Sequence, residues 1–143
     1  MGLVNLTVHP RSTVGKNANR RSRVAGRLPA VLYGKERSTE NVELDAHDFG
    51  RAMTRLAGRA AIFSLELEGV EDAPIALLRE VQRNPVTDQI LHVDLMEIPR
   101  GVPVTVAVSV EVTGVNAAMR TGEGSVALSM DTIEISCLPR ELP

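Results

Sequence analysis

Alternation between apolar and polar residues is the dominant pattern along this chain, and it predicts β-strands. The clearest example spans residues 102–112, where valine occupies every second position. A period of two places these valines on one face of a strand. Weaker alternation and short apolar runs predict further strands at residues 3–9, 30–33, 41–44, 61–67, 74–83, 89–98 and 132–138.

Helical spacing replaces the alternation in one long segment, residues 46–57. Asp45 is a good N-cap for this helix, and Gly58 is a good stop. Arg51 and Arg55 lie on the polar face, where solvent exposure is the expected account and an extension of a binding surface is the alternative. The apolar face is formed by residues at i, i+4 and i+7, which are Phe49, Met53 and Leu56.

A short helical turn is predicted through Val24, with Asn17 or Asn19 as its cap and Gly26 as its stop. Pro29 is expected to open the strand that follows. The expected fold class is therefore mainly β with short helices (α+β).

A β-hairpin is predicted from residues 74–83 and 89–98, because the sequence N-P-V-T-D between them favours a turn. In its second strand, His92 and Asp94 lie side by side on one face. The opposite face is apolar and consists of Leu91, Val93 and Leu95. The hairpin thus presents a polar pair to solvent or to a ligand.

The sequence Pro99-Arg100-Gly101 is a candidate domain boundary. It divides the chain into a domain at residues 1–99 and a segment at residues 100–143. Two or three strands in that segment are too few to bury a core of their own. The segment either packs on something else or is the first part of a second β domain that is incomplete in this sequence, and we favour the second interpretation.

Charge is distributed unevenly along the 143 residues, although the net charge is only −2. Between Arg11 and Arg37 the sequence has eight Lys and Arg residues and a single acidic residue, Glu36. The uneven distribution indicates a local basic surface rather than a generally basic protein.

The basic segment has the composition of a phosphate-binding surface. A run of arginines alone usually marks a solvated face, but this one leads into an apolar strand that ends at the only tyrosine, Tyr33. Cations attract phosphates, and an aromatic ring offers a flat face to a sugar or base, so the segment predicts RNA binding. Six cations lie within residues 11–27, namely Arg11, Lys16, Arg20, Arg21, Arg23 and Arg27.

Several other functions lack the residues they need. A single cysteine, Cys137, allows no internal disulfide and is typical of a reducing cytoplasm. The apolar runs are too short to span a membrane, and the start of the chain does not resemble a signal peptide. Gly15 and Lys16 do not form a P-loop, and the scattered histidines predict no metal site. The sequence therefore predicts no enzyme, no cofactor and no small-molecule substrate.

Two stretches resemble the signatures of a known family. Residues 15–34 read G-K-N-A-N-R-R-S-R-V-A-G-R-L-P-A-V-L-Y-G, and residues 77–95 read L-L-R-E-V-Q-R-N-P-V-T-D-Q-I-L-H-V-D-L. Both resemble the bacterial large-subunit ribosomal protein family L twenty-five, also called the general stress protein Ctc family. Residues 100–143 are similar to the opening of the second, all-β domain of its longer members. One departure is Ser22, which stands where many members have leucine.

The resemblance implies binding to 5S rRNA, at an irregular internal loop and its minor groove, by a cytoplasmic ribosomal protein. It implies a β-barrel similar to the anticodon-binding barrel of glutaminyl-tRNA synthetase, with neighbouring rRNA and large-subunit proteins as further partners. Phosphate contacts are implied for Arg11, Lys16, Arg20, Arg21 and Arg23. Contacts to sugars, phosphates or base edges are implied for Tyr33, Gln82, His92 and Asp94. The alternatives are a stress factor that meets the ribosome transiently and a protein-interaction module acting through residues 100–143.

Overall fold

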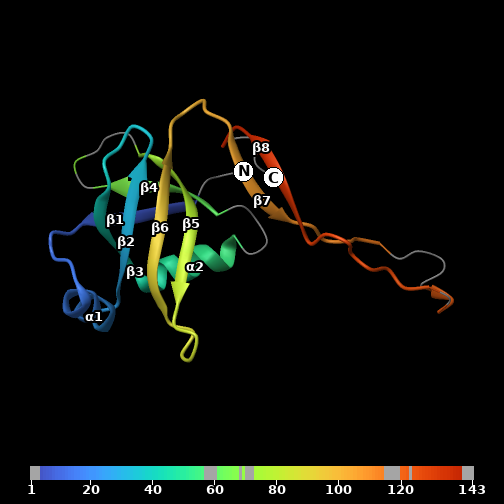
Figure 1. Ribbon diagram of the computed structural model, residues 1–143, viewed down its shortest axis with the longest axis horizontal. Helices are drawn as coiled ribbons and strands as arrows, with labels where there is room; N and C mark the ends of the chain where they lie inside the picture. The colour runs from blue at the N-terminus through green and yellow to red at the C-terminus, as the bar shows by residue number, and fades with distance from the viewer. Residues whose placement is uncertain are drawn as a thin grey trace.

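Six strands close into a barrel in the computed structural model, which describes residues 4–56, 61–67, 69, 73–114, 120–122 and 124–139 (Figure 1). The strand order around the barrel is β1-β3-β2-β6-β5-β4. These strands are β1 (Val4–Pro10), β2 (Arg27–Gly34), β3 (Glu40–Asp45), β4 (Ile62–Leu67), β5 (Ile75–Arg83) and β6 (Ile90–Ile98). The prediction of a mainly β fold with short helices is confirmed.

Two parallel pairings distinguish this barrel from a simple meander. β1 pairs in parallel with β4, and β2 pairs in parallel with β6, whereas the other neighbours are antiparallel. β2 is longer than predicted and includes Pro29, which lies opposite Glu43. Pairing of β2 with β6 begins only at Ala30, so the missing N–H of proline is tolerated at Pro29.

Helix α2 (Ala46–Arg55) lies across one end of the barrel (Figure 1). Its predicted cap is confirmed, because the Asp45 carboxylate accepts hydrogen bonds from the backbone N–H groups of His47 at 2.9 Å and Asp48 at 3.0 Å. Phe49 is fully buried, and its ring centroid lies 6.1 Å from that of Phe63 inside the barrel. The predicted stop, Gly58, lies outside the described residues.

Helix α1 (Lys16–Val24) ends where the sequence predicts, but its cap differs. Gly15 is the N-cap, with φ of 100°, a conformation that favours glycine. Asn17 and Asn19, the predicted caps, both lie inside the helix. Asn19 is instead used as a tertiary contact, since its side-chain oxygen accepts a hydrogen bond from Arg11 Nη1 at 2.7 Å.

The predicted β5–β6 hairpin is confirmed, with one change of register. Gln82 pairs with His92 and Arg83 pairs with Ile90, so Leu91 has no residue directly opposite. The prediction that Leu91 shares the inward face of Val93 is therefore wrong. Ile90 packs against the barrel core in its place.

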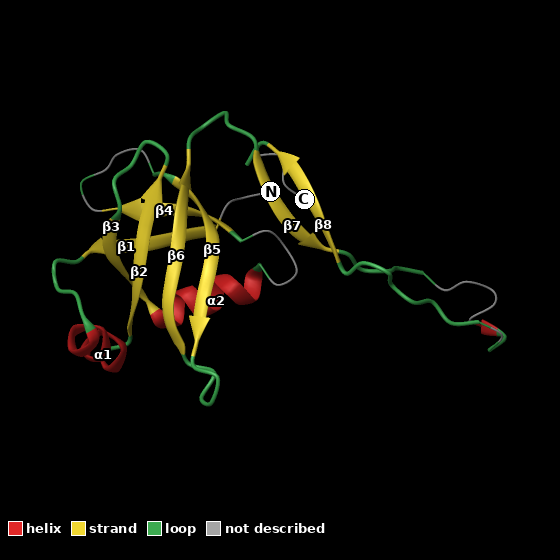
Figure 2. Cartoon of the chain, in the orientation of Figure 1, coloured by secondary structure: helices red, strands yellow, loops and turns green. Residues whose placement is uncertain are grey.

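Beyond the barrel, β7 (Val104–Ser109) and β8 (Thr132–Cys137) form a separate antiparallel pair (Figure 2). The valine strand is shorter than the predicted 102–112. Pro103 has no N–H for pairing, and pairing with β8 ends where Ser109 meets Thr132. Val104 and Val106 are buried against residues on the outside of the barrel, namely Ile62, Leu77 and Ile98.

Candidate RNA-binding surface

The outer face of β2, β6 and β5 brings together four of the nine predicted site residues. Inward residues of these strands are buried in the barrel core, so the alternate residues point outward. Tyr33 on β2 lies opposite Met96 on β6, and Gln82 on β5 lies opposite His92 on β6. Asp94 follows His92 on the same outer face.

His92 and Asp94 form a fixed pair on this face. His92 Nδ1 lies 2.8 Å from Asp94 Oδ1, and both side chains are only partly exposed, at 21% and 29%. The contact orients the imidazole ring and leaves its other nitrogen and the remaining carboxylate oxygen for a ligand. The pair therefore offers a ligand both ring nitrogen and carboxylate groups at defined positions.

Helix α1 places cations beside this face. Arg23 Nη1 donates a hydrogen bond to the backbone oxygen of Leu91 at 3.4 Å, which connects α1 to β6 directly before His92. Lys16, Arg20 and Arg21 are exposed, and no hydrogen bond or ion pair engages their side chains within the part of the chain that the structure describes. Their charges are thus available for phosphates next to the strand face.

Arg11, like Arg23, makes contacts within the fold, unlike Lys16, Arg20 and Arg21. Its side chain donates a hydrogen bond to the side-chain oxygen of Asn19 on α1, and its backbone N–H donates one to the backbone oxygen of Asn41 at 3.0 Å. Its Nε is buried and has no hydrogen-bond partner among the described residues. Arg11 therefore connects the end of β1 to α1, in addition to the phosphate contact that the sequence predicts.

Other arginines near the surface are neutralised by carboxylates. Arg27 pairs with Glu43, and Arg37 pairs with Glu97 and, at 3.2 Å, with Glu40. The hydrogen bond to Glu97 is the main reason that the pKa of the Arg37 guanidinium is raised above its ordinary value. These pairs separate structural cations from the unpaired ones on α1.

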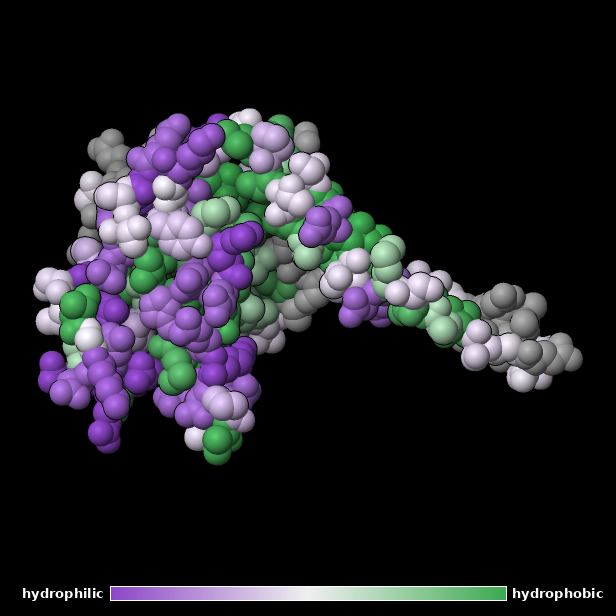
Figure 3. Space-filling model, viewed as in Figure 1, coloured by the Kyte–Doolittle hydropathy of each residue, from purple (hydrophilic) through white to green (hydrophobic). Residues whose placement is uncertain are grey.

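Sequence reasoning missed two charged residues of β5, Arg79 and Glu80. Both are exposed, and Glu80 lies directly opposite Asp94. A register shift between Leu78 and Glu80 interrupts the alternation, so period-two counting alone does not find their positions. Figure 3 shows hydrophilic residues covering much of this side of the barrel and of α1.

The exposed group Asp45, His47 and Asp48 is a weak candidate for a metal site. Among the described residues, ligand atoms of Asp45, His47 and Asp48 lie within 4.8 Å of one another, but all three side chains are exposed. Asp45 is already used as the cap of α2. No helix in the described part of the chain is long and apolar enough to cross a membrane.

A closed β-barrel with a cation-bearing helix beside a polar strand face is an arrangement typical of small nucleic-acid-binding proteins. The particular family follows from comparison with known proteins. The model of the Ribosomal L25p family matches residues 6–95, which extend from β1 into β6. The chain belongs to this family, and the resemblance inferred from its two signatures is confirmed.

Individual relatives extend the similarity beyond the barrel. The chain is 32% identical to a protein of Nitrosomonas europaea over 142 residues, which are 98% of this chain and 71% of the relative. It is 36% identical to a protein of Roseiflexus castenholzii over 96% of this chain and 62% of the relative. It is 40% identical to a Mycobacterium tuberculosis protein over 76% of this chain and 49% of that protein.

All three relatives are named large ribosomal subunit protein bL25. Family membership makes this chain a ribosomal protein, which acts as part of the ribosome in the cytoplasm. The family is one of structural, RNA-binding proteins of translation. Family membership therefore agrees with the expectation that the chain is not an enzyme.

Proposed function

We propose that this chain is a constituent of the large ribosomal subunit that binds 5S rRNA through α1 and the outer face of β2, β6 and β5. The names of its relatives support the large subunit. The observation on which the RNA-binding surface rests is the hydrogen bond from Arg23 to Leu91, which joins the cationic helix to the strand of His92 and Asp94.

The chemistry of the face suits the minor groove of an irregular RNA helix. That groove displays 2′-hydroxyls and base edges, and phosphates line its rims. Lys16, Arg20 and Arg21 would meet phosphates, which attract any cation regardless of sequence. Arg23 and Arg11 would hold α1 in place and add charge.

The strand face would supply the specific contacts. Asp94 would accept from a 2′-hydroxyl or a base amino group, and His92 and Gln82 would bond to sugar or base edges. Tyr33 would place its ring and hydroxyl against sugar and phosphate. A carboxylate next to phosphates is costly without a donor, so Asp94 makes the recognition more than electrostatic.

Asp94→Ala tests this proposal directly. Affinity of the full chain for a 5S rRNA internal-loop fragment would be measured across a salt series for wild type, Asp94→Ala and Tyr33→Ala. Loss of Asp94 should weaken binding roughly tenfold, although it removes a negative charge, because a charged hydrogen bond is lost. Tyr33→Ala should weaken it as well, and log affinity should fall linearly with log salt for all three proteins.

Glu80→Ala is the matched control, since Glu80 is the carboxylate directly opposite Asp94. Its removal should leave affinity unchanged or increase it slightly. Stronger binding by Asp94→Ala, together with equal competition from an unrelated duplex, would mean that α1 is only a generic basic patch.

We also propose that the chain divides between residues 99 and 100, as the sequence predicts, with residues 100–143 belonging to a second β domain. Exposed apolar side chains support this division, because they are concentrated in that segment: Val112, Val126, Leu128, Met130 and Ile133. The same feature favours a second candidate function, protein interaction through this segment. Ribosome binding by a chain ending at Arg100 separates that function from 5S rRNA binding.

A further inference from the structure

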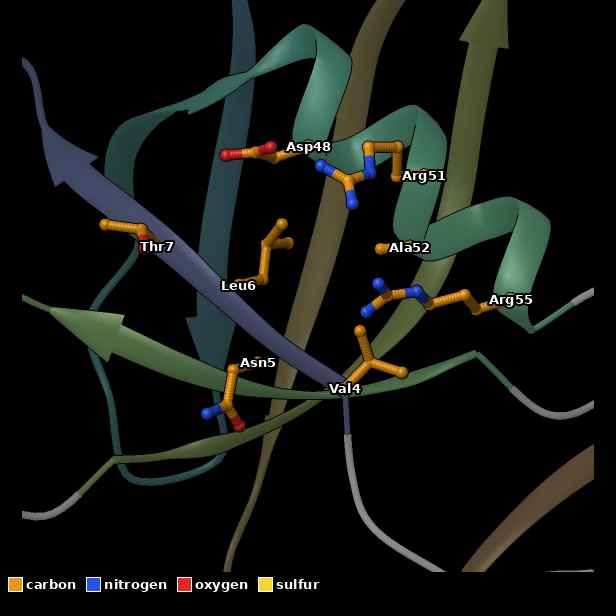
Figure 4. Close-up of a pocket in the computed structure, with 8 residues that line it drawn as sticks. All are labelled: Val4, Asn5, Leu6, Thr7, Asp48, Arg51, Ala52 and Arg55. Atoms are coloured by element: carbon orange, nitrogen blue, oxygen red, sulfur yellow. The ribbon is translucent and has the colours of Figure 1, made fainter.

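A groove lies on the side of the barrel away from the proposed 5S rRNA surface, between β1 and α2 (Figure 4). In the closed strand order, two strands separate β1 from β6 in either direction. β1 and β6 are therefore on opposite sides of the barrel. Asn5 and Thr7 on β1 line the groove, together with Asp48, Arg51 and Arg55 on α2.

Arg51 and Arg55 are the cations of this groove. They are one helical turn apart, a spacing that puts side chains about 5–6 Å apart at their Cβ atoms. Figure 4 shows both guanidinium groups directed from α2 toward β1. Both side chains are exposed, and neither has an ion-pair or hydrogen-bond partner within the described ranges. They differ in this respect from Arg27 and Arg37, whose charges are matched by carboxylates.

The remaining polar groups of the groove determine what it would bind. Asn5 and Thr7 donate to the carboxylate of Glu66 at 3.1 Å and 3.5 Å, which gives that acidic group local donors. Asp48 is exposed in the first turn of α2, where its carboxylate lies 3.8 Å from His47 Nδ1 and adds an acceptor beside the two arginines. The groove thus combines strong donors with one carboxylate acceptor.

This combination matches a ribose-phosphate backbone better than an acidic peptide. A phosphate accepts hydrogen bonds from guanidinium groups, and a 2′-hydroxyl can donate one to Asp48. Asp48 repels any anion, but a ribose hydroxyl next to each phosphate supplies a donor that offsets this cost, whereas acidic side chains of a peptide offer acceptors only. The same logic applies to the first surface, where free cations lie beside the carboxylate of Asp94.

We propose that this groove binds the backbone of a second RNA segment, so that the barrel bridges two RNA segments from opposite sides. The two arginines contact phosphates, and Asp48 accepts from a ribose hydroxyl. Arg51 and Arg55 thus do not extend the 5S rRNA surface, which was the alternative that the sequence left open. They form a surface of their own.

A two-RNA titration tests the proposal. The full chain is first saturated with unlabelled 5S internal-loop fragment, and a labelled RNA duplex of unrelated sequence is then added. The wild-type complex should bind the duplex, and Arg51→Ala/Arg55→Ala should weaken that binding about tenfold. Its log–log salt slope should fall by about 1.8, the value for two phosphate contacts on a duplex. Affinity for the 5S fragment should stay unchanged.

Arg20→Ala/Arg21→Ala is the reciprocal control, because it also removes two exposed arginines from one helix. It should weaken binding of the 5S fragment and leave duplex binding by the saturated complex unchanged. Duplex binding can also be measured without 5S fragment in the Arg20→Ala/Arg21→Ala variant, before and after the Arg51 and Arg55 changes are added. The groove is then tested even if the chain does not bind 5S rRNA, so the two proposals can fail separately. Circular dichroism would verify that each variant is folded.

Three results would overturn the proposal. In the first, the saturated wild-type complex fails to bind the duplex. In the second, Arg51→Ala/Arg55→Ala binds the duplex as well as wild type does. In the third, a polyglutamate peptide displaces the duplex and depends more strongly on Arg51 and Arg55, which would assign the groove to an acidic protein.

Discussion

The barrel and the β7–β8 pair are both built from alternating apolar strands, yet they bury those residues very differently. In the barrel, strand after strand contributes fully buried side chains, such as Leu32, Phe63 and Leu95 at 0% exposure. In β7 only Val104 and Val106 are buried, at 8% and 6%, and Ile133 on β8 remains 47% exposed. Similar sequence patterns therefore lead to unequal cores.

Closure of the sheet explains the difference. A closed barrel encloses its inward side chains and leaves no unpaired strand edge. A two-stranded pair has two open edges, and it can cover only the face that meets another surface. Here that surface is the outside of the barrel, where Ile62, Leu77 and Ile98 lie. The β7–β8 pair thus buries its apolar residues against the outside of the barrel and not in a core of its own.

The largest expected effect comes from substituting two adjacent residues of β4. Phe63 points into the barrel core and Ile62 points outward beneath β7. Phe63→Ala should lower the free energy of unfolding by about 3–5 kcal/mol, because a large cavity opens in an enclosed core. Ile62→Ala should cost about 2 kcal/mol, at the low end for its type. Equal losses of unfolding free energy in urea denaturation would contradict the distinction between the enclosed barrel core and the contact of β7 with the outside of the barrel.

A second test compares the two strands of the pair. Val106→Ala should cost about 1–2 kcal/mol, since it removes two buried carbon groups from the contact with the barrel. Ile133→Ala is the control, because its side chain is half exposed, and it should cost well under 1 kcal/mol. Hydrogen exchange of β7 should accelerate in the first variant only. A large effect of the control would indicate cover that the described residues do not provide.

The sequence predicts strands and helix caps well where local chemistry decides them. Asp45 predicts the start of α2, and the N-P-V-T-D sequence predicts the β5–β6 hairpin, because each of these features depends on neighbouring residues. Features that depend on residues distant in the sequence cannot be predicted in this way. The length of β7 depends on where β8 stops pairing, and the position of Leu91 depends on a register shift against β5.

The candidate site divides in the same way. Its residue types follow from charge and from the family signatures, including His92 and Asp94 on one face. The role of Arg11 does not follow, since only the folded chain brings it to Asn19. Nor does the location of Arg51 and Arg55, because the closed strand order, and not the sequence spacing, puts β1, which α2 contacts, on the opposite side of the barrel from β6.

A third test concerns the helix that covers one end of the barrel and has no counterpart in the β7–β8 contact. Asp45→Ala removes the cap of α2 and should lower the free energy of unfolding by about 1 kcal/mol. Asp48→Ala is the matched control, because Asp48 lies in the same turn and donates its own N–H to Asp45. It should cost only about 0.3 kcal/mol through the helix dipole. Equal effects in thermal denaturation would mean that charge, and not capping, stabilises this end.

The smallest expected effect comes from the ion pairs at the rim of the barrel. Arg37→Ala should cost about 0.5–1 kcal/mol, because its partners Glu97 and Glu40 are partly exposed. Arg83→Ala, which breaks a more exposed pair with Asp88, should cost less and depend more on salt.

The pH dependence of Arg37 sharpens this last test. Because its pKa is raised in the folded state, the stability it contributes is fully present below its ordinary pKa and is lost only as the pH rises through the raised value. The cost of Arg37→Ala should therefore be the same at about pH 6 and about pH 9, both far below that range. A cost that disappears at the higher pH would show that a different group controls the contact, and would remove Arg37 from the interactions that hold the barrel rim.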